Sequence, residues 1–492
     1  MSMSLGEQLK RRKPIVFRQH HHEGEELARN LTTFQLMMFG VGATVGTGIF
    51  FVLSESVPEA GPAVIISFLI AGLAAGLSAL CYAELASAIP VSGSTYSYAY
   101  HAMGELVAVI IAGCVLLEYG VATAAVAVGW SGYFNELLDS TIGVQIPQAL
   151  STSFIAGPGE DPTGGLLNLP AVVLVFMCMF LLLRGATESA KINSIMVVIK
   201  LGVLLLFVVI GLTAWNGSHF DNFFGAGIAG VTAAAGTIFF SFIGLDAVAT
   251  AGEEVKDPQR SLPRAIIGAL IIVTTVYVLV ALAGIAAKEA GWFETEEAQS
   301  AGLSQILNDI TGTSIWGTVL AAGAVISIFS VTLVTLYGQT RILFAIGRDG
   351  LISRKFTKVD AKTMAPNFNT IVVAIVVALI AGFVPSDYLW DTVSIGTLVA
   401  FSVVALGVLV LRRTHADLDR PFRIPGYPVT PLLTIAACVW ILIGLPMTTW
   451  VIFLAWLAIV MAFYLAYGRR NATLNTYVDP EEIAEPRGKE DQ

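Results

Sequence analysis

One charged side chain lies inside a long apolar stretch of the 492-residue sequence. Lys200 stands between Ile195–Ile199 and a run of apolar residues that continues to Gly211. An ammonium at bilayer depth costs roughly 2.5 kcal/mol or more, so it has to find a partner, face water or lose its proton. Because burial favours the neutral amine, this lysine is a candidate proton-binding group. The alternative is a permanently charged lysine that bonds backbone carbonyls and holds two helices together.

Glycines interrupt two of the apolar stretches near their middles. The first interruption lies within residues 39–50 and the second within residues 236–246. A helix broken at membrane depth exposes backbone N–H and C=O groups, which protein, water or a ligand must satisfy. Half-helix N-termini favour a carboxylate and half-helix C-terminal carbonyls favour an ammonium, and an amino acid carries both. The other interpretation of Gly40, Gly42, Gly46 and Gly48 is close helix packing, because Gly42 and Gly46 are four residues apart. The matching second interruption favours a binding site.

Two acids also lie in apolar stretches. Glu118 follows Val115-Leu-Leu, and it either faces a binding cavity or braces helices as a protonated or hydrogen-bonded side chain. Asp246 follows the second glycine interruption. Its side chain either caps the inner half-helix by accepting from free N–H groups or relays protons, and capping is the simpler interpretation. A third acid, Glu84, is expected to make structural polar contacts near the end of its span.

The composition predicts an all-α integral membrane protein. Hydrophobic residues make up 55% of the chain and charged residues 13%, whereas soluble domains carry about 25% charged residues. The four cysteines lie in apolar runs without metal-ligand spacing, so we expect packed thiols and no metal site. Apolar stretches of sufficient length predict twelve spans, at 33–58, 61–88, 104–135, 169–184, 191–214, 229–253, 264–287, 315–347, 369–385, 388–411, 430–447 and 449–468.

The basic residues predict the orientation of these spans. If both termini are cytoplasmic, all of the 27 lysines and arginines except Lys200 and Lys288 fall in cytoplasmic segments. Such an asymmetry is typical of a multi-pass protein with both ends inside. The two glycine interruptions are five spans apart, so the halves that contain them have opposite orientations, as inverted repeats require. The predicted divisions are a cytoplasmic segment 1–32, repeat one 33–214, repeat two 229–411, two further spans in 430–468, and a cytoplasmic tail 469–492.

Several short motifs resemble those of one transporter family. Gly46-Thr-Gly-Ile-Phe50 is similar to the first-span signature of permeases in the amino acid–polyamine–organocation superfamily. Phe242-Ile-Gly-Leu-Asp246 with Glu253-Glu-Val-Lys-Asp-Pro258, and Tyr337-Gly-Gln-Thr-Arg341, resemble the cationic amino acid transporter family. The resemblance implies the LeuT-type fold, with 12 transmembrane helices as a 5+5 inverted repeat plus two. Twelve spans, rather than the fourteen of vertebrate members, resemble the bacterial branch.

The resemblance also implies roles for individual residues. Lys200 matches the fifth-span lysine whose ammonium, in proton-coupled bacterial members, takes the place of a sodium ion, and Glu118 would recognise a cationic side chain or tune substrate size. The first-span motif would bind the substrate carboxylate and the sixth-span break would bind its amino group through carbonyls, with Phe240 as a candidate gate. The matching positions are Val45, Gly46, Thr47 and Gly48 in the first span, and Phe240, Ser241 and Ile243 in the sixth.

We therefore expect a secondary active transporter, a proton-coupled symporter that imports amino acids by alternating access in the plasma membrane of a bacterium. An exchanger without proton coupling is the nearest alternative, and a channel or substrate sensor on a transporter fold is the alternative from another class. No Walker motif or nucleophile elbow is present, so neither ATP drive nor an enzyme is expected. Substrate and membrane lipid are the expected partners, without nucleic acid, cofactor or sodium. The substrate range is expected to be broad and to include small neutral amino acids, and oligomeric state is not indicated.

Overall fold

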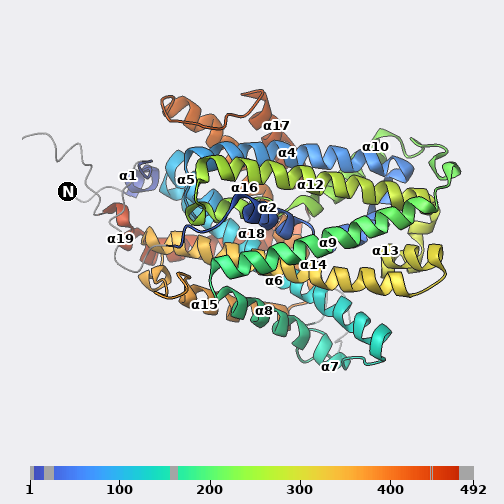
Figure 1. Ribbon diagram of the computed structural model, residues 1–492. Helices are drawn as coiled ribbons and strands as arrows, with labels where there is room; N and C mark the ends of the chain where they lie inside the picture. The colour runs from blue at the N-terminus through green and yellow to red at the C-terminus, as the bar shows by residue number, and fades with distance from the viewer. Residues whose placement is uncertain (1–4, 16–26, 156–163, 444, 446, 476–492) are drawn as a thin grey trace, which may run out of the picture.

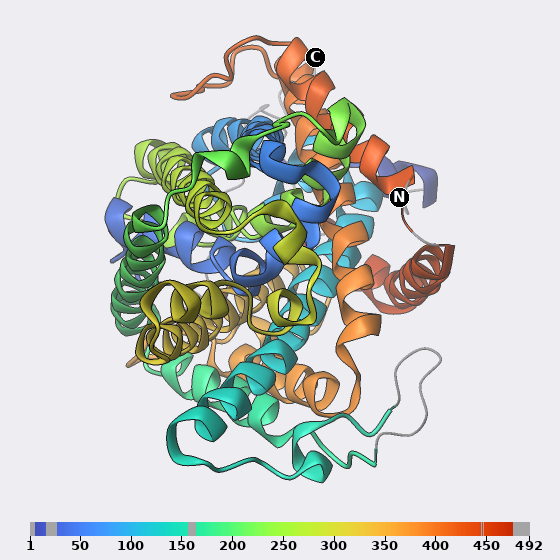
Figure 2. The ribbon, with the colours of Figure 1, turned by 90° about the vertical axis from the view of Figure 1, so that its right-hand side faces the viewer.

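The computed structural model of the protein describes residues 5–15, 27–155, 164–443, 445 and 447–475. Within these residues the chain is helical, and its extended pairing is limited to one isolated bridge between Leu31 and Val255. The long helices lie side by side in a bundle whose axis runs across Figure 1. Figure 2 views the same bundle from one end, with many helices seen nearly along their axes.

The first half of the described chain contains nine α-helices. They are α1 (Leu5–Lys10), α2 (Thr33–Thr44), α3 (Thr47–Ala60), α4 (Val64–Ala88), α5 (Ser94–Ala102), α6 (Glu105–Ile142), α7 (Gln148–Ser151), α8 (Leu169–Leu182) and α9 (Ala186–Thr213). The second half continues with α10 (Gly227–Phe239), α11 (Ala247–Thr250), α12 (Pro258–Ala287), α13 (Glu296–Thr311), α14 (Ile315–Arg348), α15 (Asn367–Phe383), α16 (Ser386–Thr414), α17 (Val429–Ile443), α18 (Met447–Phe463) and α19 (Arg469–Asn471).

Eight helical segments of the described chain are long and apolar enough to cross a membrane. One of them, Gly48–Ala88, joins nearly all of α3 to α4 across Gly61, whose φ is 61°. Three shorter apolar helices are α8, α15 and α17. Each of the twelve predicted spans overlaps at least one helix. The first and sixth predicted spans are each divided between two helices, because both are broken. The division into two inverted repeats stays a prediction.

The core of the bundle lies around α6 and α14. In their most apolar windows 67% and 72% of the residues are buried, against 17% for Met447–Asn471, which includes α18. Large apolar side chains on α17 and α18 are correspondingly exposed, with Trp440 at 81%. The helices at the centre of the bundle are therefore largely buried and can position a site, whereas the apolar surfaces of α17 and α18 face outward. All four cysteines are free and buried, as expected.

Polar contacts tie the two ends of the described chain to one end of the bundle, where α1 and α19 lie in Figure 1. Lys13 Nζ donates to Asp349 at 2.6 Å, beyond the end of α14. Arg469 Nε donates to Gln8 of α1 at 2.7 Å. The predicted structural role of Glu84 is confirmed, since its carboxylate accepts two hydrogen bonds from Arg412, at 2.8 and 2.6 Å. Residues 476–492 of the predicted tail lie outside the described residues.

Candidate functional site

The first helix break separates α2 from α3 at Val45 and Gly46. Thr32 and Gln35 form a capping box that starts α2, and α2 ends where Val45 becomes extended, with φ −78° and ψ 91°. A Cβ added to Gly46 would lie 2.8 Å from Val331 Cγ2, and one added to Gly48 would lie 2.7 Å from Ser241 Oγ. These distances are too short for a side chain. A side chain at either position would force Val331 or Ser241 to move, so glycine permits this close approach.

The second break lies between α10 and α11. A short 3-10 turn, Phe240–Phe242, follows α10, and the chain then becomes extended at Ile243, with φ −64° and ψ 143°. Gly244 has a φ of 106°, a conformation that favours glycine. A Cβ at Gly244 would lie 2.9 Å from the carbonyl oxygen of Ala43 in α2. The two breaks therefore touch each other, and both interruptions predicted from the glycines are present.

Side chains from three other helices satisfy carbonyls at the first break. Lys200 Nζ, from α9, donates to Gly42 O at 2.9 Å and to Val45 O at 2.6 Å. Ser327 Oγ, from α14, donates to the same Val45 O at 2.8 Å. The Tyr277 hydroxyl, from α12, lies 3.0 Å from Thr44 O. Backbone groups freed by a break must be satisfied at membrane depth, and here buried side chains provide the donors.

Lys200 is completely buried, and its described partners are carbonyl and hydroxyl oxygens rather than a carboxylate. Its third contact, to Ser330 Oγ, is 3.4 Å long. Ser330 in turn donates to Asn193 Oδ1 at 2.7 Å, and Asn193 Nδ2 donates to Met38 O at 3.0 Å. This chain of bonds joins α9 and α14 to α2. A change in the charge of the ammonium would act directly on the first break, because that is where its two shorter bonds end.

Asp246 does not cap α11. It stands at the N-cap position with helical dihedral angles, but its side chain accepts no hydrogen bond from the helix N-terminus. Its Oδ2 instead accepts from the Tyr119 hydroxyl of α6 at 2.6 Å, and its buried Oδ1 has no hydrogen-bond partner. The predicted cap is therefore wrong, because a tyrosine on a different helix takes the carboxylate. The predicted proton relay stays a prediction.

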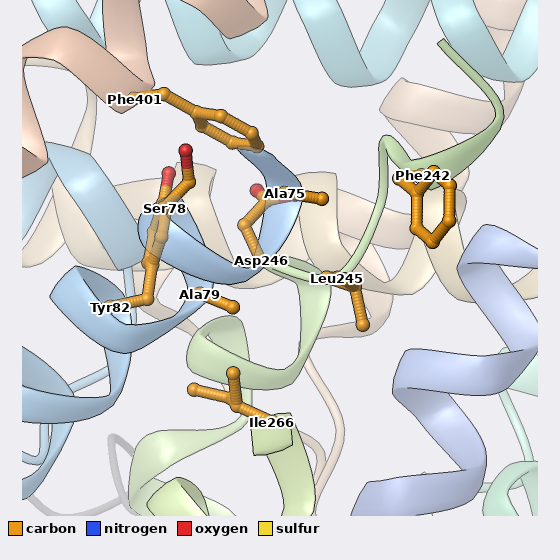
Figure 3. Close-up of a pocket in the computed structure, with 9 residues that line it drawn as sticks. All are labelled: Ala75, Ser78, Ala79, Tyr82, Phe242, Leu245, Asp246, Ile266 and Phe401. Carbon is orange, nitrogen blue, oxygen red and sulfur yellow. The ribbon is translucent and has the colours of Figure 1, made fainter. Parts of the chain in front are cut away.

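Asp246 also lines a small enclosed cavity between helices. Figure 3 shows it there with Tyr82 of α4 and Phe401 of α16. The cavity has a volume of about 10 Å³, the room that about one water molecule needs. Its remaining lining side chains are mostly apolar: Ala75, Ser78, Ala79, Phe242, Leu245 and Ile266.

Glu118 precedes Tyr119 in α6, and it is Tyr119 whose hydroxyl donates to Asp246. Glu118 Oε2 is buried without a hydrogen-bond partner. The glutamate packs against α16, since a Cβ at Gly396 would lie 3.3 Å from Glu118 Cβ. Both roles predicted for Glu118 stay open. The other predicted residues lie at the breaks: Val45 and Ser241 are buried, and Phe240 and Ile243 are half-buried.

A buried ion pair lies between the second break and the end of the bundle that carries α1 and α19. Arg341 Nε of α14 donates to Glu254 Oε1 at 2.6 Å, and the Tyr337 hydroxyl donates to the same oxygen at 2.8 Å. The ring of Phe39, from α2, packs on Tyr337 with 4.9 Å between centroids. At the opposite end, Ser54 Oγ of α3 donates to Ala298 O of α13 at 2.6 Å. Buried contacts therefore lie on both sides of the breaks.

Sequence reasoning missed four side chains of this site. Ser327 and Ser330 are three residues apart on α14, a spacing that puts both hydroxyls on one helix face. Asn193 is a polar residue inside the predicted fifth span, seven positions before Lys200, so its position was a usable signal. No comparable signal marks Tyr277, one of several aromatic residues in apolar stretches.

Comparison with known proteins gives concordant matches. The profile of the family described as "Amino acid permease" matches residues 31–474. A "Branched-chain amino acid permease BcaP" of Bacillus subtilis is 40% identical over 457 residues, which cover 92% of this chain and 95% of that protein. A "Methylthioribose transporter" of the same organism is 38% identical, over 94% of this chain and 99% of that protein.

A plant protein extends the range of relatives. "Cationic amino acid transporter 2, vacuolar" of Arabidopsis thaliana is 36% identical over 83% of this chain but only 64% of its own length. The family match spans both helix breaks, the helix that carries Lys200 and the helices that surround them. The chain is a multi-pass membrane protein of the amino acid permease family.

Proposed function

We propose that the protein is a proton-coupled symporter that carries amino acids into a bacterial cell by alternating access. The proposal comprises twelve passes in a LeuT-type arrangement, with both termini cytoplasmic and the protein in the plasma membrane. Two touching helix breaks near the middle of the bundle support it, because paired breaks are where such transporters bind substrate. The proposal includes no enzymatic activity, no resident cofactor or metal, and H⁺ rather than sodium as the coupling ion.

The contact between Lys200 and the first break carries the proposal. The ammonium lies 2.6 Å from Val45 O and 2.9 Å from Gly42 O. Hydrogen bonds from a charged donor are roughly twice as strong as neutral ones. Loss of the proton therefore weakens the attachment of α2 to α9 and favours a different geometry of the break. Proton binding can then shift the conformational equilibrium by its differential affinity for the two geometries.

The substrate would lie between the two breaks. Its carboxylate would accept from N–H groups at the start of α3, in the segment Val45–Gly48, because a helix N-terminus favours an anion. Its ammonium would donate to carbonyls of Phe240, Ser241 or Ile243. The relatives named above are a branched-chain amino acid permease, a cationic amino acid transporter and a methylthioribose transporter. We propose that neutral amino acids are the main substrates, with Glu118 tuning the range.

Uptake into proteoliposomes tests the proposal. Labelled alanine, leucine and arginine would be offered with and without an inward proton gradient, in sodium-free buffer. Accumulation that depends on the gradient is expected for at least one neutral amino acid. Methylthioribose as a competitor tests whether the substrate class of that relative applies instead.

An exchanger is the second candidate, because the same Lys200 bonds also suit a lysine that only braces α2 against α9. An exchanger would take up label only into vesicles preloaded with amino acid, and the gradient would have no effect. A channel is less compatible with the buried contacts at both ends of the bundle. Channel activity would appear as conductance far above the turnover of a carrier.

A further inference from the structure

The hydroxyl of Tyr277 touches the backbone of both helix breaks. It lies 3.0 Å from Thr44 O, at the end of α2, and 3.0 Å from Ser241 O, in the turn after α10. Tyr277 belongs to neither broken span but to α12, and its side chain is completely buried. One hydroxyl thus connects two backbone segments that lie 197 residues apart in the sequence (241 − 44).

Aromatic packing holds this hydroxyl in position. The Tyr277 ring meets Phe242 edge-on, with 5.2 Å between centroids, and Phe68 of α4 edge-on at 6.2 Å. Edge-to-face pairs at such distances are favourable arrangements of aromatic rings. The ring cannot tilt without disturbing α4 or the second break. The hydroxyl therefore sets a distance between the breaks rather than following their movements.

The two carbonyls compete for a single proton. A phenol has one O–H donor, and the backbone carbonyl oxygens of Thr44 and Ser241 can only accept. In this conformation at least one of these buried carbonyls therefore receives less than a full hydrogen bond. Ser241 O is among the carbonyls that the proposed function assigns to the substrate ammonium. An ammonium that donates to Ser241 O leaves the Tyr277 proton entirely to Thr44 O.

We propose that Tyr277 is a positioning residue that fixes the spacing between the carboxylate-binding and amine-binding segments, and so selects α-amino acids. The inference rests on the proposed function. It deepens that function by assigning a specificity determinant to a helix outside both breaks. A β-amino acid separates its amine and carboxylate by one more carbon, an increase of about 1.5 Å along the chain. With the spacing fixed by Tyr277, such a substrate cannot satisfy both segments at once.

The test compares alanine and β-alanine as competitors of labelled alanine uptake in proteoliposomes. Propionate, which lacks the amine, serves as a third competitor. In the unaltered protein the inhibition constant of β-alanine is expected to be much larger than that of alanine. In Tyr277→Phe the ratio of these constants is expected to fall by about fivefold or more, since one hydrogen bond contributes roughly that factor. Propionate is expected to bind equally weakly to both proteins.

Tyr98→Phe is the matched control. Tyr98 is also buried, with 1% exposure, and its hydroxyl has no hydrogen-bond partner. The control is expected to keep the ratio of the unaltered protein. An equal loss of maximal rate for all substrates in Tyr277→Phe, with the ratio unchanged, would mean that the tyrosine only stabilises the fold, and it would overturn the inference.

A second variant covers the case in which Tyr277→Phe does not fold, as judged by size-exclusion chromatography. Phe68→Leu keeps the Tyr277 hydroxyl but removes one of the rings that hold Tyr277 in place. The preference for alanine over β-alanine is therefore expected to fall by a smaller factor than in Tyr277→Phe. An unchanged ratio in this folded variant would also contradict the inference. If the unaltered protein shows no competition by any amino acid, the proposed function itself fails, and that result is separate from a failure of the Tyr277 inference.

Discussion

Replacement of Lys200 by methionine tests the proposed proton coupling apart from the architecture that surrounds this lysine. Lys200→Met keeps the length of the side chain and removes the charge. Of the two carbonyls that the ammonium serves, Val45 O keeps its bond from Ser327, and Gly42 O loses its donor. One orphaned buried carbonyl costs about 1–3 kcal/mol. Removal of a buried ammonium offsets part of that cost, because neutral side chains often replace buried ions without loss of stability.

The expected effect on transport is larger than the effect on stability. A gradient of one pH unit drives at most about tenfold accumulation for each proton, because about 1.4 kcal/mol corresponds to a factor of ten. In Lys200→Met the accumulation ratio should fall to about one. The midpoint of thermal unfolding should stay within several degrees of that of the unaltered protein. Labelled amino acid would be measured at steady state in proteoliposomes with an inward gradient.

Lys288→Met is the control for the loss of a lysine. Lys288 pairs with Asp309 at 2.6 Å, and both side chains are partly exposed, at 22% and 32%. We expect this variant to accumulate substrate like the unaltered protein. Proton-driven accumulation that survives in Lys200→Met would refute the reasoning. Lys200 would then be a brace between helices.

Three further outcomes follow from the same contacts. In Ser327→Ala, Val45 O keeps its bond from Lys200, but in the double variant with Lys200→Met this carbonyl has no described donor. The double variant should therefore lose more thermal stability than the sum of the losses in the two single variants. Gly46→Ala should lower the thermal unfolding midpoint, since overpacking costs about 1–3 kcal/mol, and Val331→Ala should restore the midpoint by removing the methyl 2.8 Å away. Glu254→Gln leaves a buried arginine without its carboxylate and should destabilise the protein by about 3–5 kcal/mol, measured by thermal unfolding; an unchanged midpoint would contradict the pair's role.

The helices and their interruptions could be predicted because both depend on local sequence. Long apolar runs specify helices whatever they pack against, and the glycines near Val45 and Gly244 mark where those helices break. The oxygen partners of Lys200 were one of two sequence-based alternatives, since an ammonium in an apolar stretch has to find acceptors. The capping prediction for Asp246 failed because it used only neighbouring residues. Tyr119 lies 127 positions away, and its distance from Asp246 depends on how α6 packs against the second break.

The side chains that satisfy the first break also indicate how it can move. Val45 O is bonded from α9 and α14, through Lys200 and Ser327, whereas Thr44 O is bonded from α12, through Tyr277. Movement of the break together with α12 preserves the Tyr277 bond, but movement away from α9 and α14 has to break the other two. A protonated Lys200 opposes that separation more strongly than a neutral one, because its hydrogen bonds are charge-assisted. Under the proposed proton coupling, proton binding and opening of the first break are linked through the same carbonyl, and each alters the free energy of the other by the same amount.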